Sequence, residues 1–384
     1  MWQRPDWVYC SDSLSCPAAW LIALFSRCRV LYHEHDSPED GGQWPAVGGQ
    51  SASLRCNRSE SRTFVKIFTT DGTDGMNEGR DASPRRPRAG RLGEPSLPAN
   101  SLSVQPVKSV VHCFWLRLAA PRSPLSQFQP FLLWTRKRVG RQADLVVLPN
   151  AKRLELFVQT TGRKKVSLCV YNCPRREEVL VEKREEKAQN ILRLAFHGSI
   201  NRDRLPLTVL QAMSRFPGKV HLSVVGYETL GSKGYMPTFL QTAERLGLEK
   251  AVEFIGALPR RHAIFDSAKK SDVGLAFMPI RGGDVNMANM TGASNKPFDY
   301  MACGLALLVS ARSDWEEMFV QPGYGLSCNP DDTDSVANCL RWLLDHPNKI
   351  REMGELGRQC ILTQWNYESQ FTQAASKLAD SLAL

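Results

Sequence analysis

A regular alternation of apolar, strand-like runs and amphipathic, helix-like runs occupies the second half of this 384-residue chain. It predicts strands at residues 192–197, 220–225, 252–255, 272–277 and 305–309, with helices at 206–215, 236–246, 260–268, 295–303, 333–345 and 347–363. Strands that alternate with helices fold into a parallel, doubly wound α/β sheet with helices on both faces. We therefore expect a complete α/β domain over residues 190–365. A last helix over residues 366–384 can cross back to the preceding domain.

The first half of the chain contains only part of a second domain of this kind. Residues 1–38 show a strand–helix–strand pattern, and helices and strands resume over residues 128–182. Between them, residues 39–127 are rich in Gly, Pro and Arg and have no sustained periodicity. A compact domain rarely contains so long a segment without regular structure. We interpret it as a disordered insertion, or as translated sequence foreign to the fold, that interrupts an incomplete N-terminal domain.

The segment 294–310 carries the clearest functional pattern. Ser294 can cap a short helix that ends at Gly304 and leads into a buried strand. The amino end of such a helix points toward the carboxyl edge of the sheet, where anionic ligands bind in open α/β folds. Lys296 and Asp299 are three residues apart and share one helix face. A cation suited to phosphate beside a carboxylate suited to hydroxyls indicates a nucleotide-sugar site, and a plain helix–strand junction is the alternative.

The run 295–304, Asn-Lys-Pro-Phe-Asp-Tyr-Met-Ala-Cys-Gly, resembles a signature of the retaining GT-B glycosyltransferases of the family-4 (group 1) type. The resemblance implies two Rossmann-like domains facing a cleft. It also implies metal-independent transfer of a sugar from a nucleoside diphosphate sugar, with retention at the anomeric carbon. Asn295 and Lys296 would bind the donor, and Lys296 would stabilise the departing diphosphate. Asp299, one methylene shorter than the family's glutamate, would hold the ribose hydroxyls.

A glycine and an arginine follow the first strand of the second domain. Gly198 lets the backbone approach a phosphate, and Arg204 can neutralise that phosphate. The pair resembles the diphosphate-binding loop of the family, in which Arg204 takes the place of a lysine and Ser199 that of an arginine. Thr291 stands where the family has its first acid, which contacts the donor sugar. Leu258 resembles, by strand order, a residue of the loop that binds the base.

The sequence His-Glu-His-Asp after the second strand is the densest cluster of titratable groups. In an extended chain His33 and His35 share one face and, with Asp36, could ligate a metal. Polar residues at a strand end also often only cap a turn. The resemblance favours a third interpretation, in which a histidine of the acceptor domain faces the donor sugar. His35 matches best, so we expect it to act in catalysis with Arg204 and Lys296.

Composition limits the partners and the compartment. The net charge of +10 predicts an anionic partner such as a nucleotide or, peripherally, a membrane surface. No nucleic-acid-binding motif is present, so we expect no nucleic acid partner. Eleven scattered cysteines without a CxxC pair, together with the lack of a signal peptide or membrane-spanning run, predict a cytoplasmic protein. We expect no cofactor besides the donor substrate.

Several questions stay open at the sequence level. The acceptor can be a saccharide, a lipid-linked molecule or a small molecule, and the oligomeric state is undetermined. An inactive glycosyltransferase-like protein, either a binding relic or a truncated gene product, is the main alternative function. The incomplete first domain, Ser199 and Thr291 favour that alternative. A metal-dependent hydrolase that uses His33 and His35 is a further one.

Overall fold

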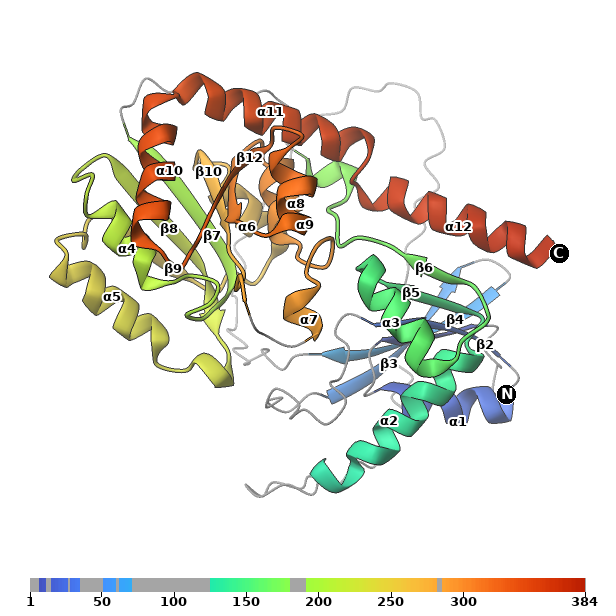
Figure 1. Cartoon of the computed structure of the whole chain (residues 1–384). Helices are drawn as coiled ribbons and strands as arrows, with labels where there is room; N and C mark the ends of the chain where they lie inside the picture. The colour runs from blue at the N-terminus through green and yellow to red at the C-terminus, as the bar shows by residue number, and fades with distance from the viewer. Residues whose placement is uncertain are drawn as a thin grey trace, which may run out of the picture.

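Two α/β domains, each built on a six-stranded sheet, make up the described part of the chain (Figure 1). The computed structural model describes residues 7–11, 15–26, 28–34, 51–59, 62–70, 125–179, 191–281 and 285–383. The strand order is β3-β4-β1-β2-β5-β6 in the first sheet and β12-β11-β10-β7-β8-β9 in the second. The prediction of two Rossmann-like domains is confirmed.

The N-terminal domain places three helices beside a mostly parallel sheet. Its elements are β1 (Trp7–Ser11), α1 (Cys16–Ser26), β2 (Arg29–His33), β3 (Ser51–Ser59), β4 (Arg62–Thr70), α2 (Leu125–Gln142), β5 (Leu145–Leu148), α3 (Ala151–Thr161) and β6 (Ser167–Cys169). Strands β4, β1, β2, β5 and β6 run parallel to one another. Val8, Tyr32, Val146 and Phe157 belong to one buried cluster of this domain, which joins the sheet to helix α3.

Two strands occupy part of the segment for which the sequence predicted no regular structure. β3 and β4 form an antiparallel pair, and β4 continues the sheet by pairing with β1 from Trp7 opposite Phe64 to Cys10 opposite Ile67. Residues 62–70 are rich in β-branched and aromatic side chains, which favour strands. Strand β1, the partner that joins this pair to the sheet, lies more than fifty residues away, so local periodicity could not reveal the connection. The other residues of 39–124 lie outside the described part.

The C-terminal domain is fully parallel and doubly wound. After a single turn η2 (Arg176–Glu178) come β7 (Leu192–Ile200), α4 (Leu207–Met213), β8 (Val220–Glu228), η3 (Leu230–Ser232), α5 (Tyr235–Arg245), β9 (Val252–Gly256), α6 (Arg261–Ala268), β10 (Val273–Ala276), α7 (Val285–Ala288), α8 (Lys296–Ala302), β11 (Ala306–Ser310), α9 (Ser313–Trp315), η4 (Glu316–Val320), β12 (Gly325–Cys328), α10 (Thr333–Asp345) and α11 (Pro347–Thr363). Every predicted strand and helix of this domain is present. Strand β12, the short helices α7 and α9, and the turns η2, η3 and η4 were not predicted.

Helix α8 is held very tightly against strand β10. All seven residues of α8 are buried. A Cβ atom on Gly274 would lie 2.1 Å from Cγ of Tyr300, so only glycine permits this approach. Helix α11 packs closely as well, because a Cβ atom on Gly354 would lie 2.1 Å from the carbonyl oxygen of Gly304. The residues at the start of α8 are therefore fixed relative to the sheet.

The last helix, α12 (Tyr367–Ala383), returns to the N-terminal domain (Figure 1). The Tyr367 amide donates a hydrogen bond to the Pro174 carbonyl at 2.8 Å. Ala374 is buried in a cluster with side chains of β5, β6 and the residue after β6, namely Leu145, Val147, Leu168 and Val170. Among the described helices, none combines the length and the apolar character needed to cross a membrane.

Candidate functional site

Gly198 and Lys296 meet at the carboxyl end of β7. Gly198 has φ of +104°, which L side chains rarely adopt. A Cβ atom at this position would lie 2.9 Å from Nζ of Lys296. Because Gly198 has no side chain, the Lys296 ammonium can approach the backbone at the end of β7. Two residues that the sequence predicted for the donor site are brought together here.

Lys296 is a buried cation, with 3% of its surface exposed. Its Nζ lies 5.7 Å from the centroid of the Phe196 ring. Burial lowers the pKa of Lys296 to about 7; the positive charge of Arg204 acts in the same direction, and Asp299 opposes it. A buried lysine that titrates near neutrality is a common feature of functional sites, because its charge is costly until an anion binds.

Arg204 lies in the turn after β7 and is oriented by Ser199. Its Nη1 donates a hydrogen bond to Ser199 Oγ at 3.0 Å, and its Nη2 lies 3.9 Å from Met287 Sδ. The backbone amide of Arg204 donates to Asn201 Oδ1 at 2.9 Å. Ser199, which replaces an expected arginine, thus positions the remaining one.

Asp299 is buried and already has several partners. Arg261 donates from Nη2 to Oδ1 at 2.6 Å and from Nη1 to Oδ2 at 3.3 Å, and Asn295 Nδ2 donates to Oδ2 at 3.1 Å. Arg261 also binds Glu178, with 2.6 Å between Nε and Oε1. Burial raises the pKa of Asp299 to about 6, whereas Arg261 lowers it. Arg261 is thus the main partner of this buried carboxylate.

His197 and Tyr300 are further members of the site that the sequence analysis missed. The His197 amide donates to the Tyr300 hydroxyl at 2.9 Å, and His197 Nε2 lies 3.5 Å from Asp299 Oδ2. Burial, with the positive charges of Lys296 and Arg261, keeps the pKa of His197 well below its usual range, so the ring is neutral. Its position directly before Gly198 at a strand end was the signal available in the sequence.

The loop before α8 differs from the prediction at Ser294. Asn295, with φ −75° and ψ −20°, occupies the N-cap position and makes no side-chain cap, so the predicted Ser294 cap is wrong. The Ser294 hydroxyl is instead buried and has no hydrogen-bond partner within the described residues. Thr291, where an acid was expected, donates a hydrogen bond to the carboxylate of Asp314. An acidic side chain therefore contacts position 291 from helix α9, which follows β11.

Leu258 and His33 are the remaining predicted residues that the structure describes. Leu258 is half-buried in the turn between β9 and α6, two strands from β7 at the same sheet edge. His33 Nδ1 lies 2.5 Å from the Tyr9 hydroxyl. His35 and Asp36 lie outside the described residues. Within the described ranges, no three His, Cys, Asp or Glu side chains come together to hold a metal ion.

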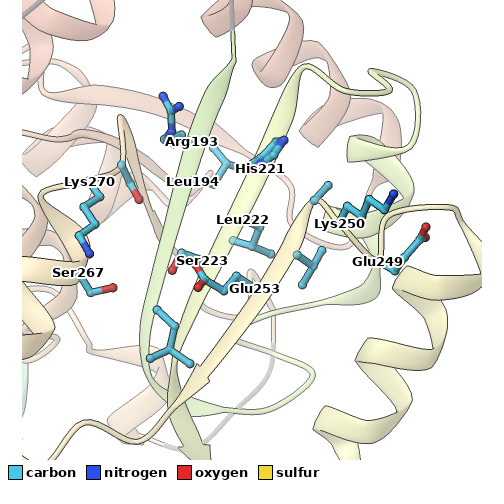
Figure 2. A pocket seen from close by; sticks show the side chains of 14 residues that line it. Arg193, Leu194, His221, Leu222, Ser223, Glu249, Lys250, Glu253, Ser267 and Lys270 are labelled. Carbon is cyan, nitrogen blue, oxygen red and sulfur yellow. The ribbon is translucent and has the colours of Figure 1, made fainter. Parts of the chain in front are cut away.

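A hollow of about 720 Å³ lies elsewhere on the C-terminal domain (Figure 2). It is lined by the first residues of β7, β8 and β9 and the end of α6, including Arg193, His221, Glu253 and Lys270. Arg193 precedes Gly198 by five residues along β7, which corresponds to about 16 Å in a strand. This hollow is therefore separate from the candidate site at the opposite edge of the sheet.

Comparison with known proteins gives one family match, over part of the chain. Residues 207–376 match the family model described as "Glycosyl transferase-like". No curated protein matches the chain in sequence.

Among solved structures, the chain is similar to sucrose-phosphate synthase from Thermosynechococcus elongatus (13% identity, 98% of this chain and 74% of that chain covered, TM-score 0.56). It is also similar to HepE from Anabaena in complex with UDP-glucose (13% identity, 98% and 79% covered, TM-score 0.57). A third is α,α-trehalose-phosphate synthase (UDP-forming) from Burkholderia xenovorans in complex with glucose-6-phosphate (12% identity, 98% and 73% covered, TM-score 0.56). The shared fold is the two-domain GT-B architecture that the sequence predicted.

Proposed function

We propose that this chain is a glycosyltransferase, which transfers a sugar from a nucleoside diphosphate sugar to an acceptor hydroxyl. Its GT-B fold and the family match over residues 207–376 support the proposal. The observation that carries the proposal is the buried Lys296 ammonium 2.9 Å from the position that a Cβ on Gly198 would occupy, with Arg204 close enough to lower its pKa. Two cations beside an unobstructed strand end suit a diphosphate, which carries the negative charge of such a donor.

In the proposed reaction, the bond between the anomeric carbon and the diphosphate oxygen breaks while the acceptor oxygen bonds to that carbon. The acceptor proton passes to the departing diphosphate. Lys296 and Arg204 stabilise the charge that develops on the leaving group, a role that divalent metals fill in other enzymes. The proposal therefore includes metal independence, and it includes retention of the anomeric configuration.

The remaining donor contacts belong to the proposal as well. The Asp299 carboxylate can accept hydrogen bonds from ribose hydroxyls once Arg261 shares it or moves aside, and Asn295 lies beside it at 3.1 Å. Leu258 would flank the base, and His35 would face the sugar. HepE is known in complex with UDP and glucose, which makes UDP-sugars the first donors and saccharides the first acceptors to test. The scattered cysteines, nine of which are free thiols in the described part, support a cytoplasmic location.

The test measures nucleotide binding by the full chain. Calorimetry with UDP, GDP and ADP, each without and with EDTA, is expected to show binding of one nucleotide regardless of chelator. Arg204→Met and Asp299→Asn are expected to weaken that binding at least tenfold, whereas Lys349→Met, an exposed lysine of the same domain, leaves it unchanged. The configuration of any product formed from the matching sugar donor is read by NMR.

Each outcome decides between the candidate functions. No binding of any nucleotide contradicts the proposal outright. Nucleotide binding without transfer to any saccharide supports the inactive, binding-only alternative. Loss of binding in EDTA contradicts metal independence but not sugar transfer.

A further inference from the structure

An arginine of the N-terminal domain extends into the C-terminal domain. Arg153 lies in the first turn of α3 and is 1% exposed. Its Nε donates to the Asn289 carbonyl at 2.8 Å, and its Nη2 donates to the Asn286 carbonyl at 2.7 Å and lies 2.9 Å from Met290 Sδ. One buried guanidinium thus binds both ends of the segment that contains α7. Figure 1 shows α7 next to α3, between the two sheets.

Neighbouring residues of the same domain continue this contact along the loop. Asn150 caps α3 by accepting from the Arg153 amide at 3.0 Å, and its Nδ2 donates to the Thr291 carbonyl at 2.7 Å. The Asn172 amide donates to the Gly292 carbonyl at 2.8 Å, and its Nδ2 donates to the Ala293 carbonyl at 2.7 Å. We call residues 285–293 the strap. Apart from the cap of α3, every one of these hydrogen bonds crosses from one domain to the other.

The N-terminal domain approaches the strap so closely at one glycine that a side chain there would clash. Gly292 has φ of +76°, and a Cβ atom there would lie 2.3 Å from Cδ1 of Tyr171 and 2.9 Å from the Pro149 carbonyl oxygen. The ring of Tyr171 in turn stacks on Phe298 of α8, with 6.2 Å between centroids. The N-terminal domain therefore packs against the strap and against α8, the helix that carries Lys296.

The strap contacts the candidate donor site at Arg204 and helix α9 at Asp314. Met287 Sδ lies 3.9 Å from Nη2 of Arg204, and Thr291 donates to Asp314. The strap then runs through Ser294 directly into Lys296. A shift of the strap would move the sulfur that packs on Arg204 and the residues that lead into α8.

From these contacts we propose that Arg153 is a positioning residue, which holds the strap so that the donor site of one domain is completed only by the docked partner domain. Arg153 touches no substrate and acts through Met287 on Arg204. Only the expected effect on donor binding rests on the proposed function. Its structural part, the fixing of the strap, is independent of any ligand.

The test compares Arg153→Met and the milder Arg153→Lys with Arg163→Met. Arg163 is an equally buried arginine of the same domain, 4% exposed, whose Nη1 donates to Gly140 and Ala143 carbonyls within that domain at 2.7 Å. It therefore controls for loss of a buried guanidinium. Hydrogen exchange is followed at the amides of Asn289, Ala293 and Ser294, all of which donate to carbonyls of the strap. The affinity for the nucleoside diphosphate that the wild type prefers is measured by calorimetry.

Arg153→Met is expected to speed exchange in the strap at least tenfold and to weaken nucleotide binding about tenfold. Arg153→Lys should give intermediate values for both, because its single amine can keep one carbonyl contact. Arg163→Met should leave both within twofold, even if the whole protein becomes less stable. Unchanged strap exchange in Arg153→Met, or equal effects in Arg163→Met, overturns the proposal. Faster strap exchange in Arg153→Met with unchanged nucleotide affinity overturns the role of Arg153 in the donor site. A wild type that binds no nucleotide defeats the proposed function, while the exchange data still decide on the strap.

Discussion

Replacing Lys296 by methionine should make the protein more stable and unable to bind nucleotide. The side chain is 3% exposed, and burial moves its pKa from an ordinary 10.5 to about 7. A difference of one in pKa corresponds to about 1.4 kcal/mol, so keeping the ammonium buried costs the folded state at most about 5 kcal/mol. Methionine has a similar shape and no charge, and replacing buried charge by apolar groups is often stabilising.

The pH dependence tests the origin of this effect. Because the pKa of the folded protein is lower, the unfolded chain binds more protons between pH 7 and pH 10.5, and wild-type stability should rise with pH across that window. The advantage of Lys296→Met in the free energy of unfolding should accordingly shrink, from about 5 kcal/mol at pH 6 to about 2 kcal/mol at pH 9. Below pH 7 the full cost applies, since both states are protonated.

Urea unfolding at pH 6, 7.5 and 9 measures these differences, with the exposed Lys349→Met as the matched control that should change stability by less than about 0.5 kcal/mol. Calorimetry with the preferred nucleoside diphosphate gives the functional side of the comparison. Wild-type affinity should fall above pH 7 and binding should take up protons there, because the diphosphate favours the charged lysine. A stability difference that is constant with pH, or a destabilised Lys296→Met variant, would refute the reasoning.

Three further variants test other parts of the structure. Gly198→Ala places a Cβ 2.9 Å from Lys296 Nζ at φ +104° and should cost about 1–3 kcal/mol and most of the nucleotide affinity, measured by urea unfolding and calorimetry. Arg261→Gln removes the main partner of Asp299 and should destabilise the protein by about 1–3 kcal/mol in urea unfolding. The loss should be smaller at pH 5 than at pH 8, because the Asp299 carboxylate is protonated at pH 5. Glu34→Gln breaks a buried pair with an α2 arginine at 2.6 Å and should cost about 3–5 kcal/mol in thermal or urea unfolding without altering nucleotide affinity.

Much of the C-terminal domain was predictable because its signals are local. Each strand is an apolar run and each helix an amphipathic one, so the periodicity of a short window identifies both. The donor motif was also local, since Lys296 and Asp299 lie on one short helix and Gly198 and Arg204 on one turn. These four residues could be named from the sequence, and the structure places Gly198, Lys296 and Arg204 close together.

The partners of these residues could not be predicted because they are distant in sequence. Arg261 binds Asp299 across 38 residues, and Arg153 reaches Asn289 across 136. No periodicity links such positions, and only the tertiary fold brings them together. The pairing of β4 with β1 was missed for the same reason. The Ser294 cap failed on a smaller scale, because a helix start is uncertain by a residue or two.

The return of α12 has a consequence for the order in which the protein folds during synthesis. Ala374 completes the cluster over β5 and β6, so one apolar face of the first sheet stays uncovered until residue 374 has left the ribosome. The domain that is made first is thus finished last. In the interval, Leu145, Val147 and Leu168 remain open to unwanted contacts. The strands and covering helices of the C-terminal domain follow one another directly, so this domain can fold in that time. Helix α12, which follows it in the chain, then packs against the first sheet.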